Sequence, residues 1–303
     1  MNPENRPESR QESEIDWGLL NKSVDTIIQN QLKERINPNA FSGVYGAEEI
    51  KKDNETVERI KANFLQNPEE AQKKKFADAL EIVIEQQISK DEWFGENAVI
   101  APTSEHDDFI NKVDGIVEFY TDGESDDRIA LVLDASLGDK SLSTKKKIDI
   151  NIRRMLGKNS PAEVKYFESQ TTPYKGRLAR IIPIVVGLDG KHSGELFALF
   201  GAVIESKEAE RLPEGHLEAK KEELRMHPAQ MVFLEQAHEQ LTMYERLLEN
   251  NPESSYTIEE VQKTRLIIEN IIASKKDAGL KGIEDDGVLN IIRFEAAQAG
   301  RPS

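Results

Sequence analysis

The chain has 303 residues, 38% hydrophobic and 32% charged, a balance typical of a globular protein with a sizeable core. It contains no cysteine, which excludes disulfides, thiolate metal sites and cysteine nucleophiles. Its formal net charge of -16 argues against a protein covered with nucleic-acid-binding charge, because an acidic surface repels phosphates.

The N-terminal part is predicted to be a tail followed by helices. Residues 1–16 are rich in polar residues and have almost no apolar side chain to bury, so we expect a disordered tail. Residues 17–67 form a predicted N-terminal helical region, because apolar residues recur there at helical spacing. No apolar run approaches the roughly 20 residues of a membrane helix. The polar start of the chain lacks the apolar core of a secretory signal, so we expect a cytoplasmic protein with no membrane contact.

Residues 68–205 are predicted to form an α/β (α+β) core. A helix over 68–89 carries its apolar residues on one stripe. Two strands joined by the acid-rich turn TDGESDD follow, then a basic helix over 143–156, strands over 162–169 and 179–189, and a short helix. The last strand is apolar on both faces, so we expect it at the centre of the sheet. This order predicts a mixed β-sheet flanked by helices.

Residues 206–276 contain a predicted C-terminal helical hairpin. Apolar residues at three-four spacing begin after Pro228, and Thr257 with Glu260 forms a capping box at the start of the second helix. Packing against the core is the ordinary role of such a pair, and a homodimer contact is the alternative. We expect residues 277–303 to be a C-terminal tail.

Positive charge is concentrated in residues 140–180, which contain eleven basic and three acidic residues. The local charge of +8 leaves -24 for the rest of the chain. Such segregation favours a polyanion bound at one face, and we expect nucleic acid as the partner. A solvated helix face with loop lysines is the alternative.

The predicted hairpin places one carboxylate in each of two apolar strands. Centring the turn on Glu124 sets Asp114 directly opposite Asp134. The same register sets Lys112 opposite Ser136 on the same face. Opposed carboxylates destabilise a strand pair unless a cation, a proton or a basic neighbour offsets them, and Mg²⁺ favours such oxygen ligands. Two ordinary strand-edge acids are the alternative.

The helix before the hairpin offers a third oxygen ligand. Glu81 borders its apolar stripe and is the first candidate, and Glu85 is the second. A solvated helix face is the alternative for each glutamate.

These elements resemble the core of the PD-(D/E)XK, or restriction-endonuclease-like, nuclease superfamily over about residues 73–190. The resemblance lies in a helix with a glutamate, a strand with an aspartate, a strand ending in an acid about twenty residues later, a basic helix and further strands. Carried over by position, the motif aspartate is Asp114 and the (D/E) residue is Asp134. The helical glutamate is Glu81 or Glu85. The family's lysine falls two residues after Asp134, where this chain has serine.

The resemblance implies hydrolysis of phosphodiester bonds in DNA or RNA, with the carboxylates holding Mg²⁺ or Mn²⁺. Some members of the superfamily supply the lysine from elsewhere, and this chain offers Lys112, Lys145 or Lys146. The residues then expected to contact phosphates are Arg153, Arg154, Lys158, Arg177 and Arg180. Two alternatives remain: an inactive domain of the same core that binds nucleic acid or protein, and an unrelated structural or assembly protein.

Other chemistries have less support in the residues. GLDGKHSGE contains a Gly-Lys pair without the spacing of a phosphate-binding loop, and GxSxG does not occur. The five histidines include no HxxxH pair, and His227 with His238 on one helical face is more often a packing coincidence than a zinc site. In WFGEN, Trp93 and Phe94 fit a loop anchor better than a base-stacking platform.

Overall fold

The fold is described from a computed structural model, which places residues 17–30, 35–121, 124–134, 141–208 and 215–299. Its helices are α1 (Trp17–Asn30), η1 (Pro38–Phe41), α2 (Ala47–Leu65), α3 (Pro68–Asp91), η2 (Asp107–Asn111), α4 (Ser141–Met155), α5 (Gly190–Glu208), α6 (His216–Arg225), α7 (Ala229–Glu249), α8 (Ile258–Asp277) and α9 (Gly287–Ala299). Its strands are β1 (Ala98–Pro102), β2 (Gly115–Thr121), β3 (Glu124–Asp134), β4 (Glu163–Glu168), β5 (Lys175–Ala179) and β6 (Ile182–Gly187). The predicted mixture of helices and strands, an α+β class, is confirmed. None of the described helices combines the length and hydropathy of a membrane span.

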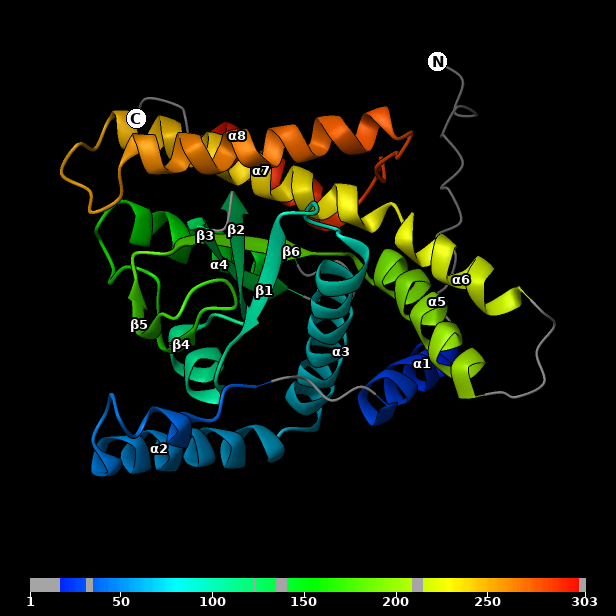
Figure 1. The fold of residues 1–303 in the computed structure, drawn as a ribbon, viewed down its shortest axis with the longest axis horizontal. Helices are drawn as coiled ribbons and strands as arrows, with labels where there is room; N and C mark the ends of the chain where they lie inside the picture. Colours follow the sequence, from blue (N-terminus) through cyan, green and yellow to red (C-terminus); the bar gives the residue numbers. More distant parts are fainter. Residues whose placement is uncertain (1–16, 31–34, 122–123, 135–140, 209–214, 300–303) are drawn as a thin grey trace, which may run out of the picture.

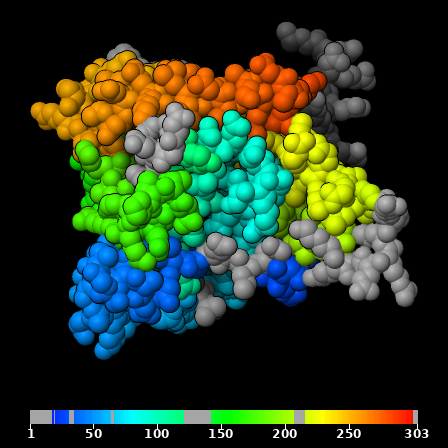
Figure 2. Space-filling model, viewed as in Figure 1, coloured from blue at the N-terminus to red at the C-terminus, as the bar shows by residue number. Residues whose placement is uncertain are grey.

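The main sheet has four strands in the order β1-β2-β3-β6. β1, β2 and β3 are antiparallel neighbours, and β6 joins β3 in parallel. β4 and β5 form a separate two-stranded sheet. Figure 1 shows α7 and α8 side by side above the main sheet, α3 against it, and α2 at the opposite end of the molecule from α8. In the space-filling view, α8 and its neighbours in orange and α2 in blue form these two ends (Figure 2).

The register of the β2–β3 hairpin differs from the predicted one. Gly115 pairs with Leu131, so continuing the register by one residue sets position 114 opposite position 132 rather than Asp134. Thr121 pairs with Glu124, so the pairing is not centred on Glu124, and the register also shifts between Phe119 and Tyr120. The prediction was wrong because Asp-Gly favours a two-residue turn, which the symmetric centring on Glu124 ignored.

Strand β6 lies at the edge of the sheet, not at its centre. All six of its residues are buried, as predicted, but the burial comes from α7, which runs along its outer side. Gln240 donates to the carbonyl of Val185 at 2.7 Å and accepts from its N–H at 2.9 Å. Gln236 makes the same two contacts with Gly187, at 2.8 and 2.9 Å. These side chains complete the hydrogen bonding of a strand edge that would otherwise be buried without partners.

The match between α7 and β6 follows from their repeats. Four residues of helix advance about 6 Å and two residues of strand about 6.6 Å, so a helix position every four residues meets every second strand residue. Tyr244, four residues beyond Gln240, donates its hydroxyl to the carbonyl of Pro183 at 2.9 Å. A donor alone is sufficient at Pro183, because proline has no N–H.

The C-terminal segment predicted as a tail contains α9. Val288, Leu289 and Ile292 are buried in the main core, and the helix packs against α7 and α4. Their three-four spacing, with Asp286 as the N-cap acid, is typical of a helix, so the prediction of a tail was wrong. In the hairpin of α7 and α8, the predicted capping box of Thr257 and Glu260 is present. α7 contributes to the same main core as α3 and β6.

The WFGEN segment anchors the loop after α3. Trp93 and Phe94 are fully buried, so neither offers a face on which a base could stack. The Trp93 ring stacks on His227, with centroids 6.2 Å apart and planes 14° from parallel. The His227 Nδ1 accepts from the N–H of Ala229 at 3.2 Å, which requires that nitrogen to be unprotonated.

This environment makes His227 a source of acid sensitivity. Burial first, and then the charge of His192, lower the pKa of His227 to about 4 from 6.5. Between pH 6.5 and pH 4 the unfolded chain binds a proton at this histidine and the folded protein does not. The free energy of unfolding is therefore highest above pH 6.5 and falls as the pH drops from 6.5 toward 4. Between pH 7 and pH 5 the expected loss is about 2 kcal/mol.

Urea unfolding of the wild type and His227→Asn at the two pH values measures this loss. Asparagine keeps an acceptor near the Ala229 N–H but does not titrate, so the difference between pH 7 and pH 5 should shrink by about 2 kcal/mol in the variant. Equal pH dependence in the two proteins would show that His227 is not the group responsible.

Candidate active site

Three charged residues of α3 lie along one face of that helix. The start of the helix is fixed by its N-cap, since the Asn67 side chain accepts from two backbone N–H groups and Pro68 occupies the first turn. Lys74, Asp78 and Glu81 are four and then three residues apart, which places them on adjacent turns of the same face. Glu81 is only 1% exposed, because it borders the apolar stripe that packs into the core.

The fourth charged residue comes from η2, a π-helical turn between β1 and β2. Asp107 and Asp108 are both buried there. Asp107 accepts from the backbone N–H groups of Lys165 and Tyr166 at 2.7 and 3.1 Å, and so holds the turn against β4. Asp108 contacts α3 instead, where its carboxylate accepts from Lys74 at 2.9 Å.

Lys74 lies among several carboxylates. Its Nζ is 2.9 Å from Asp108 Oδ2, 3.1 Å from Asp78 Oδ1 and 3.8 Å from Glu81 Oε1. Burial opposes its charge, but Asp108, Asp78 and Asp114 outweigh burial and raise the pKa of Lys74. Lys74 therefore remains protonated at neutral pH.

Arg35 supplies a second cation to the same group. Its Nη2 is 2.9 Å from Asp108 Oδ2 and 3.7 Å from Asp78 Oδ1. Burial opposes its charge, and the two aspartates, Asp108 before Asp78, raise the pKa of Arg35 above its ordinary value. Arg35 also lines a cavity of about 310 Å³ together with His106 and Glu105, so it lies between that cavity and the carboxylates.

Asp114 immediately precedes β2 and is 9% exposed. The Thr103 hydroxyl donates to the Asp114 carbonyl at 3.0 Å, which ties the start of β2 to the end of β1. Its carboxylate is near enough to raise the pKa of Lys74. Asp114 is therefore electrostatically coupled to Lys74 on α3. Asp134 is the last residue of β3 and pairs with Gly187, but its side chain and the whole of Ser136 lie outside the described residues.

We define Asp78, Glu81, Asp108 and Asp114, with Lys74 and Arg35, as the acid cluster. One oxygen from each of Asp78, Glu81 and Asp108 lies within 4.8 Å of the others, a spacing at which they could hold a metal ion. An all-oxygen donor set suits Mg²⁺ or Mn²⁺. When every group is ionised, the four carboxylates exceed the two cations by two negative charges, which a divalent ion would offset.

The predicted catalytic lysines lie elsewhere. Lys112 is exposed in a left-handed turn before β2, because the chain must reverse at the end of η2, and it is not in the strand. Lys145 pairs with Glu295 of α9 at 2.6 Å, and Lys146 is exposed on α4. The lysine beside the carboxylates is Lys74 instead. Glu85, the second candidate ligand, lies one turn beyond Glu81 and outside the group of three oxygens.

Three of the five predicted phosphate-binding residues contact other groups of the chain, and the other two are exposed. Arg154 is half-buried and donates to the carbonyl of Asn111 at 3.0 Å, which joins α4 to the turn before β2. Arg177 pairs with Glu163 across β4 and β5, and Arg180 donates to the carbonyl of Ser255. Arg153 and Lys158 are exposed near the end of α4.

Much of the local positive charge is also offset by acids from other segments. Lys165 pairs with Asp53 and Glu49 of α2, and Lys145 pairs with Glu295 of α9. The concentration of charge in the sequence therefore overstates the positive charge that these residues present.

Sequence reasoning missed Lys74, Asp78, Asp108 and Arg35. The first two carry a weak signal, because a lysine and an aspartate seven and three residues before Glu81 share its helix face. Asp108 and Arg35 are brought to that face by tertiary contacts alone. Comparisons of the chain with protein-family models, with curated proteins and with solved structures found no match.

Proposed function

We propose that the chain is a metal-dependent phosphodiester hydrolase of DNA or RNA, with the acid cluster as its active site. The observation that carries this proposal is the close group of Asp78, Glu81 and Asp108 oxygens, with the amine of Lys74 3.8 Å from Glu81 and the charge of Asp114 acting on the same amine. A helix glutamate, a strand aspartate and a lysine are the three residue types that the resemblance to PD-(D/E)XK nucleases implies. The element order α3-β1-β2-β3-α4-β6 supports the same restriction-endonuclease-like interpretation.

In this proposal the close oxygens of Asp78, Glu81 and Asp108 would hold Mg²⁺ or Mn²⁺, with Asp114 beside them. The bound metal would activate water and stabilise the charge that develops on the phosphate. Lys74 would take the role of the family's lysine, because the position where that lysine is expected is Ser136 in this chain. Since its carboxylate neighbours raise its pKa, Lys74 would act as a charged donor that orients water or phosphate rather than as a general base. Asp108 and Arg35 would position Lys74 through the shared carboxylate.

An inactive nucleic-acid-binding or protein-binding module is the second candidate. The observation that favours it is that Lys74 and Arg35 already bond to Asp108, so part of the carboxylate charge is compensated within the chain. Exposed Arg153 and Lys158 would then contribute to binding a polyanion. Replacing both by glutamine should lower the affinity for nucleic acid and flatten its salt dependence.

A cleavage assay tests the catalytic proposal. Labelled single- and double-stranded DNA and RNA are incubated with the protein and Mg²⁺ or Mn²⁺, with a chelator as the blank. We expect Glu81→Gln to lower the rate at least about 100-fold, a typical cost of losing a group that stabilises transition-state charge. Glu70→Gln, at a glutamate of the same helix whose side chain is 42% exposed, is the matched control and should leave the rate unchanged.

Two outcomes would contradict the proposal. Wild-type protein that produces no metal-dependent fragments on any of the four substrates is not a nuclease of this kind, and binding without cleavage then favours the module. Equal rates for Glu81→Gln and Glu70→Gln would place any cleavage outside the acid cluster.

A further inference from the structure

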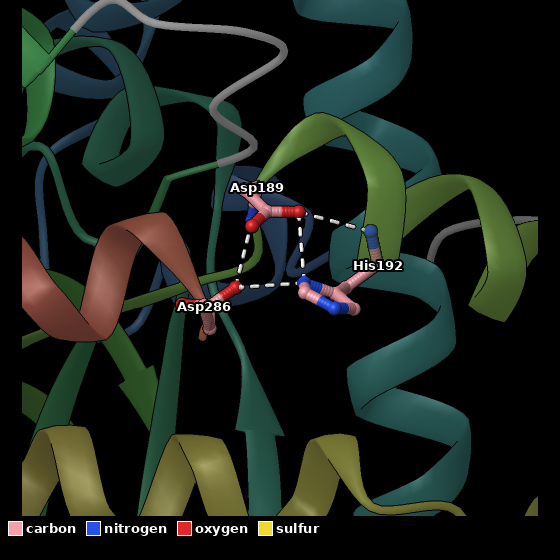
Figure 3. A group of neighbouring side chains, drawn as sticks. All are labelled: Asp189, His192 and Asp286. Atoms are coloured by element: carbon pink, nitrogen blue, oxygen red, sulfur yellow. Dashed lines mark hydrogen bonds and ion pairs between the residues drawn. The ribbon is translucent and has the colours of Figure 1, made fainter. Parts of the chain in front are cut away.

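A second cluster of ionisable side chains lies where β6, α5 and α9 meet. Asp189 follows β6, His192 is in the first turn of α5, and Asp286 immediately precedes α9. Figure 3 shows the three side chains pointing toward one another from segments nearly a hundred residues apart. One ligand atom from each lies within 4.8 Å of the other two. We call these three residues the junction cluster.

Backbone N–H groups hold both carboxylates in place. Asp189 accepts from the N–H of His192 and from that of Gly287, each at 3.0 Å. Asp286 accepts from the N–H of Leu289 at 2.8 Å and from that of Asp189 at 3.0 Å. Each aspartate therefore caps its own helix and also binds the backbone of the other segment. Metal-ligating carboxylates are commonly oriented by hydrogen bonds of this kind.

The position of the His192 ring is not explained by helix capping. Capping uses the carboxylates and the backbone and needs no imidazole. His192 is nonetheless 8% exposed, with its Nδ1 2.9 Å from Asp189 Oδ1 and 3.6 Å from Asp286 Oδ2. Within the described residues that nitrogen makes ion-pair contacts with both carboxylates but no hydrogen bond of normal geometry.

The spacing suits a shared metal ion. Two ligands of a tetrahedral zinc ion with bonds of about 2.1 Å lie about 3.4 Å apart. The two nitrogen–oxygen distances, 2.9 and 3.6 Å, lie on either side of that value.

Charge favours the same occupant. With a protonated imidazole the buried group carries one net negative charge, whereas a divalent ion with a neutral imidazole leaves it neutral. Burying an uncompensated charge is costly. The imidazole also discriminates between metals, because nitrogen ligands suit zinc and related transition metals whereas Mg²⁺ and Ca²⁺ favour oxygen alone.

We propose that Asp189, His192 and Asp286 form a binding site for a divalent transition metal of the zinc type, which joins α9 to the end of β6. This site is separate from the acid cluster and does not depend on the proposed hydrolase activity. The ion would cross-link residues 189 and 286 and so stabilise the docking of the C-terminal helix. Protons compete with the metal for the imidazole nitrogen, so the affinity should fall as pH is lowered.

Metal titrations of the full chain test this inference. Zn²⁺ binding is measured by calorimetry, and Co²⁺ binding by its visible absorption, after removal of metal with a chelator. We expect about one equivalent bound by the wild type, and at least about tenfold weaker binding by His192→Gln. Zn²⁺ should raise the melting temperature of the wild type more than that of the variant.

Two control variants make the titration specific. His238→Gln removes a histidine that pairs with Glu269 between α7 and α8, and it should bind Zn²⁺ like the wild type. His216→Gln removes an exposed histidine at the start of α6 and should also leave this affinity unchanged. Equal affinity of His192→Gln and the wild type would overturn the assignment, as would wild-type binding that is detectable only at millimolar Zn²⁺.

A spectroscopic readout covers the case in which His192→Gln does not fold. Nitrogen-15 spectra of the wild-type histidine rings are recorded with and without Zn²⁺. Coordination must shift the Nδ1 resonance of His192, while the rings of His238 and His227 stay unchanged. An unshifted His192 would overturn the proposal whatever the variant does.

Discussion

Gln240→Leu should destabilise the protein by about 3 kcal/mol, since each buried backbone group that loses its partner costs about 1–3 kcal/mol. The change keeps an apolar stem of similar size in a fully buried position of α7. It removes the acceptor of the Val185 N–H and the donor to the Val185 carbonyl. Both groups then remain on a buried strand edge with no partner.

Urea unfolding at neutral pH measures this loss. The midpoint should fall while the slope stays unchanged, because the surface exposed on unfolding is nearly the same. Gln262→Leu, at an exposed position of α8, is the matched control and should change stability by less than about 0.5 kcal/mol.

Tyr244→Phe provides a graded comparison, because it removes only the hydroxyl that donates to the Pro183 carbonyl. It should cost about 1 kcal/mol, less than the glutamine change. A loss of under about 1 kcal/mol for Gln240→Leu would mean that other groups satisfy Val185. The interpretation of α7 as the hydrogen-bonding cover of the sheet edge would then be wrong.

Lys74→Met should also cost about 3 kcal/mol at neutral pH, because removing one partner of a buried ion pair leaves an uncompensated charge. Asp108, Asp78 and Glu81 would lose the amine that lies among them, while Asp108 and Asp78 would keep Arg35. Methionine preserves most of the stem, so the loss reports charge rather than packing. If the acid cluster holds a divalent ion, added Mg²⁺ should restore part of the stability of the variant.

Lys73→Met is the matched control for this prediction. Lys73 is the preceding residue of the same helix and pairs with Glu69 and Glu70 at the surface, where solvent screens such pairs and they add little to stability. Chemical denaturation with and without Mg²⁺ compares the two variants. A Lys74→Met protein as stable as Lys73→Met would show that the carboxylates do not need this cation. It would remove the physical basis for assigning Lys74 to the active site.

Local patterns in the sequence predicted several elements well. The helix that became α3 was recognised because Phe76, Leu80 and Ile84 repeat with the period of a helix, and all three are buried as that pattern requires. The capping box that starts α8 depends only on Thr257 and Glu260, which are three residues apart. Such features are set by hydrogen bonds and side-chain contacts within one or two turns, so the order of residues is sufficient to reveal them.

Strand neighbours were harder to predict. A fully apolar strand indicates burial on both faces, but it does not say whether a strand or a helix covers each side, and β6 is covered by α7. The β2–β3 register depends on the turn position and on the shift at Phe119, and both changed the partner expected for Asp114. A single residue of error in a turn moves every pair in a hairpin.

The candidate site divides in the same way. Glu81 and Asp114 could be named from the sequence, because each carboxylate adjoins a recognisable apolar pattern. The choice of lysine could not, because Lys112, Lys145 and Lys74 are equally cationic and only the packing of η2 and Arg35 against α3 selects Lys74. The junction cluster could not be predicted at all from the sequence, since Asp189 and Asp286 meet only after α9 has docked. Periodicity records which face of an element is buried, whereas contacts between distant segments depend on how those faces pack together.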